Sequence, residues 1–101
     1  MPKTPGYVIV EVEVTDPAAM QEYVAKVGPT LATYDARLLV RGKARAKEGA
    51  IPVGMIVVIE FDSVTDAESW YGSPSYAEII PLRQRAANTR LFIVEGEPGN
   101  S

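Results

Sequence analysis

Tyr7-Val-Ile-Val-Glu-Val-Glu-Val14 is the stretch from which the fold can be argued. Its even-numbered positions are all valine, and its odd-numbered positions carry Tyr7, Ile9, Glu11 and Glu13. Strict alternation with many β-branched residues is typical of a strand that has one buried face. We therefore predict a strand over residues 7–14 whose valine face packs against a core.

The segment after this strand predicts a long helix. Asp16 can cap its amino end, and Pro17 suits the first helical position, where no backbone N–H is needed. Apolar residues then recur every three or four positions, at Met20, Tyr23, Val24, Val27, Leu31 and Tyr34. That spacing gives the helix one apolar stripe that faces a core. Because proline removes a helical hydrogen bond, we expect Gly28-Pro29 to kink or divide this helix.

Two further strands are predicted in the middle of the chain, over residues 36–46 and 53–62. Gly49 marks the loop between them, around residues 47–52. Residues 55–59 are all apolar, and such a run is typical of a central strand that is covered on both faces.

The last third of the chain predicts two helices and a strand, over residues 64–71, about 74–87 and 89–95. Ser63 can cap the first helix, and Ser73 followed by Pro74 can begin the second. Pro81 lies inside the second helix, so we expect a kink or a break there.

The order β-α-β-β-α-β predicts a ferredoxin-like α+β domain with the first and third strands at the centre. Its four-stranded antiparallel sheet would carry the helices on one face only. A chain of 101 residues is one domain, residues 1–101, with a structured core of about 6–96. The other sheet face would present Tyr7, Ile9 and one side of the apolar run, so we expect a second copy to cover it in a homodimer.

The composition excludes several classes of function. The chain contains no cysteine and no histidine, so disulfides, thiolate chemistry, the commonest metal ligand and the commonest general base are all missing. We accordingly expect no metal and no cofactor.

The formal net charge of −3 is the opposite of the positive charge that is usual for a nucleic-acid binder. With no run of 18 apolar residues and no signal-peptide pattern at the start, we expect no membrane partner and a cytoplasmic location.

A stripe of basic residues alternates along the second predicted strand, at Arg37, Arg41, Lys43 and Arg45. One interpretation is a site for an anion or a carboxylate, with Arg41 as the forked donor. The other, which we favour for the stripe as a whole, is ion pairing with the acidic residues of neighbouring strands, namely Glu11, Glu13, Glu60 and Asp62. Alternatively, one glutamate among Glu11, Glu13, Glu60 and Glu95 could act as a base if burial raised its pKa. Ion pairing with the basic stripe would instead lower that pKa.

Aromatic residues offer a second candidate site, made of Tyr23, Tyr34, Trp70, Tyr71 and Tyr76. They could line an apolar pocket with phenol groups for a small ligand, or they could simply pack the helices on the sheet. Packing is the favoured role for Tyr23 and Trp70, whereas Tyr76 is evenly balanced. Ser73 with Arg83 could form an anion site at a helix start, although a plain cap is favoured. No serine has a histidine partner for a hydrolase triad.

The segment Trp70-Tyr-Gly-Ser-Pro-Ser-Tyr76, with Pro81-Leu-Arg83, Ala86 and Phe92-Ile-Val-Glu-Gly96, resembles the family catalogued as domain of unknown function 1330. Tyr7, Arg41-Gly42 and Val58-Ile-Glu-Phe61 add to the similarity, which spans roughly residues 6–96. The resemblance implies a ferredoxin-like fold of the dimeric α+β barrel superfamily, in which two sheets pack face to face. It implies no established activity.

The function that we expect is a homodimeric domain that binds a small molecule between sheet and helices, an acidic one if Arg41 anchors it. The polar ligand-binding residues would be Arg41, Tyr34, Tyr76 and Arg83. A cofactor-free enzyme of the oxygenase or isomerase type is an alternative that rests on fold analogy, and a purely structural dimer is a third. A deep pocket with a buried carboxylate would favour the enzyme, and a filled core would favour the structural dimer.

Overall fold

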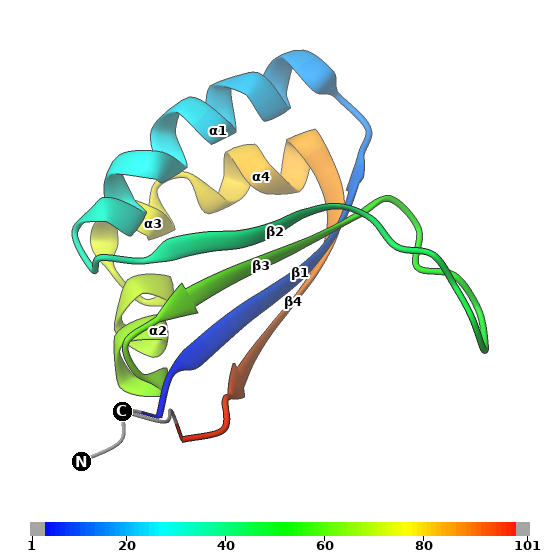
Figure 1. Ribbon diagram of the computed structural model, residues 1–101. Coiled ribbons are helices and arrows are strands. Elements are labelled where there is room, and N and C mark those ends of the chain that lie inside the picture. The colour runs from blue at the N-terminus through cyan, green and yellow to red at the C-terminus, as the bar shows by residue number, and fades with distance from the viewer. Residues whose placement is uncertain (1–3, 99–101) are drawn as a thin grey trace.

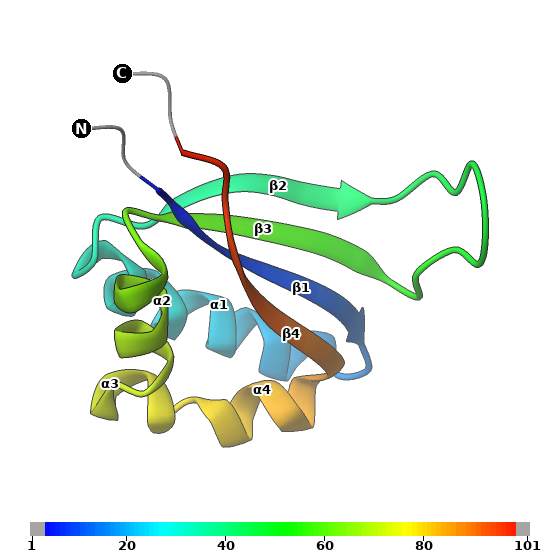
Figure 2. The ribbon, with the colours of Figure 1, turned by 90° about the horizontal axis from the view of Figure 1, so that it is seen from below.

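The computed structural model describes residues 4–98, which form a four-stranded antiparallel sheet with helices on one face (Figures 1 and 2). The elements in chain order are β1 (Gly6–Val14), α1 (Pro17–Ala32), β2 (Arg37–Lys43), β3 (Met55–Phe61), α2 (Val64–Tyr71), α3 (Pro74–Ala77), α4 (Ile80–Ala86) and β4 (Ala87–Glu95). This order confirms the predicted ferredoxin-like α+β fold. Within the described residues, no helix is both long and apolar enough to span a bilayer.

The strands lie in the order β2-β3-β1-β4, so the first and third strands are central, as predicted. Both neighbours of β1 are antiparallel to it, and Val10 lies between Val57 of β3 and Leu91 of β4. Val8 and Val10 on the helix-facing side of β1 are buried, which confirms the predicted valine face.

Local signals set the helix ends. The side chain of Asp16 accepts a hydrogen bond from the backbone N–H of Ala19 at 3.2 Å and caps α1. Pro29 lies inside α1, yet the helix continues to Ala32, so the expected division does not occur. The expected break near Pro81 is confirmed: α3 ends at Ala77, and Pro81 occupies the first turn of α4.

Aromatic rings form the centre of the core beneath α2 and α3. The ring centre of Trp70 lies 4.1 Å from that of Tyr76 and 5.5 Å from that of Phe61. All three side chains are almost fully buried. The indole Nε1 of Trp70 donates to the hydroxyl of Thr30 on α1 at 3.0 Å, so this polar atom has a partner inside the core.

A β-bulge in β2 breaks up the predicted basic stripe. Leu38 pairs with Ile59 and Val40 pairs with Val58, so Leu39 is an extra residue in the strand. Because one extra residue reverses the faces that follow it, Arg37 points to the helix-free face whereas Arg41 points to the helix side. The prediction that both share one face is therefore wrong.

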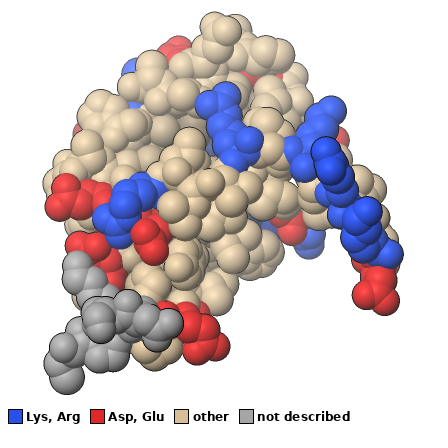
Figure 3. Space-filling view, in the orientation of Figure 1, with Lys and Arg blue, Asp and Glu red and all other residues tan. Residues whose placement is uncertain are grey.

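The chain between β2 and β3 is an arm, residues 44–54, that projects beyond the sheet (Figures 1 and 2). The two strands were predicted to extend into it, but their pairing ends at Lys43 and Met55. Lys and Arg side chains gather along this arm (Figure 3). Ile51 and Val53 on it are exposed.

Candidate functional site

A pocket of about 420 Å³ lies between α1 and the helix-facing side of the sheet. Its floor consists of inward-facing apolar residues of the strands, such as Val10, Val57 and Leu91, and its roof consists of residues of α1 such as Met20 and Val27. Helix α1 makes its largest contact with α4 rather than with a strand. The helix is thus held over the sheet from one side, and the space beneath it is not filled by side chains.

The mouth of the pocket lies between α1 and the edge strand β2. Val24, Gly28 and Ala32 recur at every fourth position of α1, so they lie on one side of the helix, and all three are exposed. Leu38 and Arg41 of β2 form the opposite rim and are exposed as well. Gly28 adds no side chain at this rim, which leaves the entrance wide.

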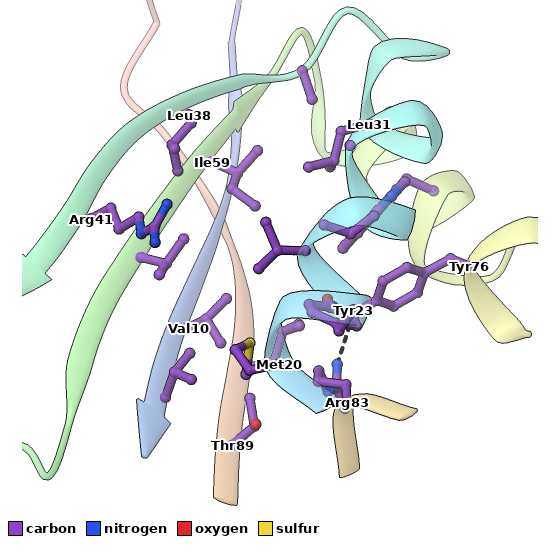
Figure 4. Close-up of a pocket in the computed structure, with 18 of the residues that line it drawn as sticks. Val10, Met20, Tyr23, Leu31, Leu38, Arg41, Ile59, Tyr76, Arg83 and Thr89 are labelled. Atoms are coloured by element: carbon purple, nitrogen blue, oxygen red, sulfur yellow. Dashed lines mark hydrogen bonds between the residues drawn. The ribbon is translucent and has the colours of Figure 1, made fainter. Parts of the chain in front are cut away.

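The far end of the pocket holds a buried polar cluster. The guanidinium of Arg83 donates through Nη1 to the hydroxyl of Tyr76 at 2.9 Å (Figure 4). The Tyr76 hydroxyl lies 2.9 Å from that of Tyr23, and the two phenols share a hydrogen bond. Tyr23 comes from α1, Tyr76 from α3 and Arg83 from α4, so the cluster links three helices.

This polar cluster carries a net positive charge, which comes from Arg83. Burial raises the pKa of Tyr23 far above its ordinary value, and the nearby Tyr76 adds to this, so Tyr23 is a neutral phenol. Burial by itself lowers the pKa of Arg83, but the oxygens of Tyr76 and Tyr23 outweigh it and the net shift is upward. Arg83 is therefore a protonated guanidinium that is only 9% exposed.

Two buried polar atoms that line the pocket have no hydrogen-bond partner among the described residues. They are Nε of Arg83 and Oγ1 of Thr89. Thr89 faces the pocket because it pairs with Val12 on the helix-facing side of the sheet. Unsatisfied buried polar atoms are rare in native proteins, so two of them on residues that line one pocket make it the candidate site.

The sequence matches the family described as domain of unknown function (DUF1330) over residues 5–97. The chain belongs to this family. The family name carries no activity, and no curated protein matches the chain.

Solved structures share the fold of this DUF1330 chain. A protein of unknown function from Rhodopseudomonas palustris superposes with a TM-score of 0.75 at 18% identity, over 96% of this chain and 85% of that one. A dimeric ferredoxin-like protein of unknown function from Bacteroides fragilis has a TM-score of 0.59 at 11% identity, with 90% and 95% covered. SnoaB, a cofactor-independent oxygenase from Streptomyces nogalater, has a TM-score of 0.58 at 9% identity, with 98% and 97% covered. At such identities the likeness concerns the fold alone.

Three of the four ligand-binding residues predicted from the sequence line the pocket of this DUF1330 chain. Arg41 lies at the mouth, whereas Tyr76 and Arg83 lie at the far end (Figure 4). Tyr34 is not among the lining residues and packs on Phe61, with 6.4 Å between the ring centres. Tyr34 therefore does not belong to the candidate site.

Sequence reasoning ranked one member of the site too low and missed another. Tyr23 was a candidate pocket residue for which packing was favoured, and Thr89 was not singled out. The signal for Thr89 was its place in β4, where Leu91 and Ile93 continue the same inward face. A hydroxyl at such a position needs a partner inside the fold.

The basic and acidic residues of the helix-free face pair with one another. Arg37 binds Glu60 at 2.8 Å and Asp62 at 3.1 Å, and hydrogen bonding to Glu60 raises the pKa of Arg37. Arg90 of β4 binds Glu11 at 2.6 Å. For Arg37, the ion-pair interpretation of the basic stripe is thus confirmed.

Within the described residues, the acidic candidates do not line the pocket and are not gathered into a metal-ligating group. None of the described residues that line the pocket is a carboxylate. Across residues 4–98, no three or more acidic side chains come together as a metal site would require. Ser73 accepts from the backbone N–H of Tyr76 at 3.3 Å, which confirms its role as a helix cap.

Proposed function

We propose that this protein is a homodimeric binding domain that takes a small molecule with an apolar body and an acidic group into the pocket beneath α1. The observation that carries the proposal is the pocket itself, an aliphatic space of about 420 Å³ with Arg41 at its mouth and Arg83 at its far end. Pockets of 300–1,000 Å³ with a few placed polar groups are typical of small-molecule sites.

The two alternatives receive less support. A purely structural dimer would have a filled core, whereas here a space of this size remains between α1 and the sheet. A cofactor-free enzyme that abstracts a proton needs a base beside its substrate. The described lining residues include no carboxylate, so no observation favours this reaction over binding.

The helix-free face supports self-association. Ile9 at its centre lies between Val58 and Phe92, and Val40 lies beyond Val58 on the edge strand. Phe92 and Val40 are 45% and 46% exposed. A contiguous apolar patch of this kind marks an interaction surface, and structures of similar fold are described as dimeric. We propose that a second copy covers this face.

A thermal-shift screen tests the ligand proposal. The panel pairs small apolar carboxylates with neutral analogues of the same chain length and is applied to the wild-type protein. We expect several members to raise the melting temperature, because filling the pocket buries apolar surface in the native state only. The proposal fails if no member of either class raises it.

A matched pair of variants locates the binding. Val57→Trp would fill the pocket from the floor and should abolish the shift. Val53→Trp makes the same substitution on the exposed arm and should leave the shift unchanged. Equal shifts in both variants would show that binding occurs outside the pocket.

A further inference from the structure

The pocket contains a buried positive charge that has no counter-charge among residues 4–98. Arg83 is 9% exposed, and no carboxylate of residues 4–98 forms an ion pair with it. Its hydrogen-bond partner Tyr76 is a phenol, and the next member of the cluster, Tyr23, is one too. A buried charge without an opposite charge destabilises the fold, so an anion entering here would relieve that cost.

Two donors without partners among the described residues belong to side chains that line this pocket. Nη1 of Arg83 is used by Tyr76, whereas Nε has no partner. Thr89 contributes a second buried group without a partner, a hydroxyl that can donate one hydrogen bond. Because β4 begins directly after α4, at Ala87, Arg83 and Thr89 lie on either side of one junction. Both residues therefore lie at the end of the pocket where α4 meets the sheet (Figure 4).

The rest of the pocket is suited to an apolar body. Thr89 lies on β4 and Arg41 lies on β2, at opposite edges of the sheet (Figure 4). Three inter-strand spacings of about 4.8 Å separate these edges by about 14 Å. Between them the floor is aliphatic, made by side chains such as Val10 and Val57. At about 30 Å³ for each water-sized group, the pocket has room for roughly a dozen non-hydrogen atoms.

We propose that the ligand is an apolar monocarboxylate that binds with its head inward. Its carboxylate accepts hydrogen bonds from Arg83 Nε and Thr89 Oγ1 at the α4–β4 junction, and its apolar chain lies across β1 and β3 toward the mouth. Arg83 and not Arg41 is then the anchor, since Arg41 is exposed at the rim, where water screens its charge. This inference rests on the function proposed above and specifies its ligand class and orientation.

Isothermal titration with sodium octanoate and with 1-octanol tests this orientation. These two probes share the apolar chain and differ in the head group. We expect wild-type protein to bind octanoate at least tenfold more tightly than octanol. If octanol binds as tightly as octanoate, the inward-head inference is wrong and the proposed ligand needs no acidic group, although binding of a small apolar molecule in the pocket survives. If neither binds, both fail.

Substitutions then identify the anchor. Arg83→Met keeps the length of the side chain and removes its charge, so the preference for octanoate should fall from tenfold or more to about one. Arg85→Met is the matched control on the same helix; Arg85 is exposed and does not line the pocket, so the preference should persist. Unchanged octanoate affinity in Arg83→Met would overturn the inference.

Two further variants keep the test decisive if Arg83→Met does not fold. Thr89→Val is isosteric and removes only the hydroxyl, so it should weaken octanoate about threefold to tenfold and leave octanol unchanged. Arg41→Lys should preserve the preference for octanoate. If Arg41→Lys abolishes that preference and Thr89→Val does not alter it, the acid group binds at the mouth and the inward orientation is wrong.

Discussion

Single polar atoms in the core decide how tightly the helices are fixed on this sheet. The hydroxyl of Thr30 accepts from Nε1 of Trp70 at 3.0 Å and donates to the carbonyl of Val27 at 2.7 Å. It links α1 to Trp70 in the aromatic core beneath α2. Since a buried donor that loses its acceptor costs more than a hydrogen bond contributes on average, this hydroxyl should matter more than its size suggests.

The first prediction concerns this link. Thr30→Val keeps the side-chain shape and leaves the Trp70 Nε1 without an acceptor, so we expect the free energy of unfolding to fall by about 1–3 kcal/mol. Urea denaturation followed by tryptophan fluorescence measures it. Thr33→Val is the control, because Thr33 is exposed and donates only to the carbonyl of Pro29; its cost should stay within about 0.5 kcal/mol. Equal losses in both variants would contradict the role of Thr30.

The buried phenol of Tyr23 predicts a pH dependence. Its pKa is raised by burial in the folded state, whereas an unfolded tyrosine titrates near 10. The stability that Tyr23 contributes is therefore fully present below pH 10 and is lost as the pH rises above it, because only the unfolded chain releases the proton. Between pH 9 and pH 11 this loss amounts to about 1.4 kcal/mol.

Tyr23→Phe removes that titration. The difference in unfolding free energy between wild type and Tyr23→Phe should shrink by about 1.4 kcal/mol from pH 9 to pH 11. Urea denaturation at several pH values across this range measures the difference. A difference that stays constant would show that the Tyr23 phenol is not protected in the folded state.

At the scale of elements, local patterns predicted the strands and helices well and their faces less well. Asp16, Ser63 and Ser73 each cap a helix where expected, because a cap depends only on residues three positions apart. The bulge at Leu39 could not be predicted, since the extra residue is recognisable only from the pairing with β3. It decides that Arg41 faces the pocket, so part of the candidate site also lay beyond the sequence pattern.

Gly28 on α1 carries the element-scale prediction. A Cβ at this position would contact nothing beyond its chain neighbours, and the backbone there is helical. Alanine loses less backbone entropy than glycine in a helix, which favours it by about 0.5–1 kcal/mol, but its Cβ would crowd the Cδ of the following Pro29. The two effects oppose each other, so Gly28→Ala should change the free energy of unfolding by less than about 0.5 kcal/mol. Thermal or urea unfolding measures this change.

Gly54→Ala provides the contrast, because Gly54 has a φ of +83° and its Cβ would crowd the backbone of Val12. This variant should destabilise the protein by more than about 1 kcal/mol. If Gly28→Ala destabilises to a similar extent, the rim of the pocket is more tightly packed than the structure shows.

At the scale of the whole molecule, each side of the sheet has its own role. The helix-facing side carries the pocket, and the helix-free side carries the apolar patch around Ile9. The sequence predicted that the second face would be apolar, because alternation assigns faces directly. The size of the space beneath α1 could not be predicted from the sequence, because it depends on how α4 holds α1 over the sheet. Contacts between distant helices are not encoded in any local pattern.

The last prediction concerns assembly through the helix-free face. Ile9 lies at the centre of that face between Val58 and Phe92, so a charge placed there in a dimer would lose its water without gaining a partner. Analytical ultracentrifugation of wild type should give twice the chain mass at micromolar concentration, and Ile9→Asp should sediment as a monomer at the same concentration.

Ala18→Asp adds the same charge at the exposed amino end of α1, where the helix dipole favours it, and should remain dimeric. A monomeric wild type, or a dimer that tolerates Ile9→Asp, would show that this face is not the interface. Because the pocket opens on the opposite side of the sheet, the Ile9→Asp monomer should still respond to octanoate, which separates assembly from binding.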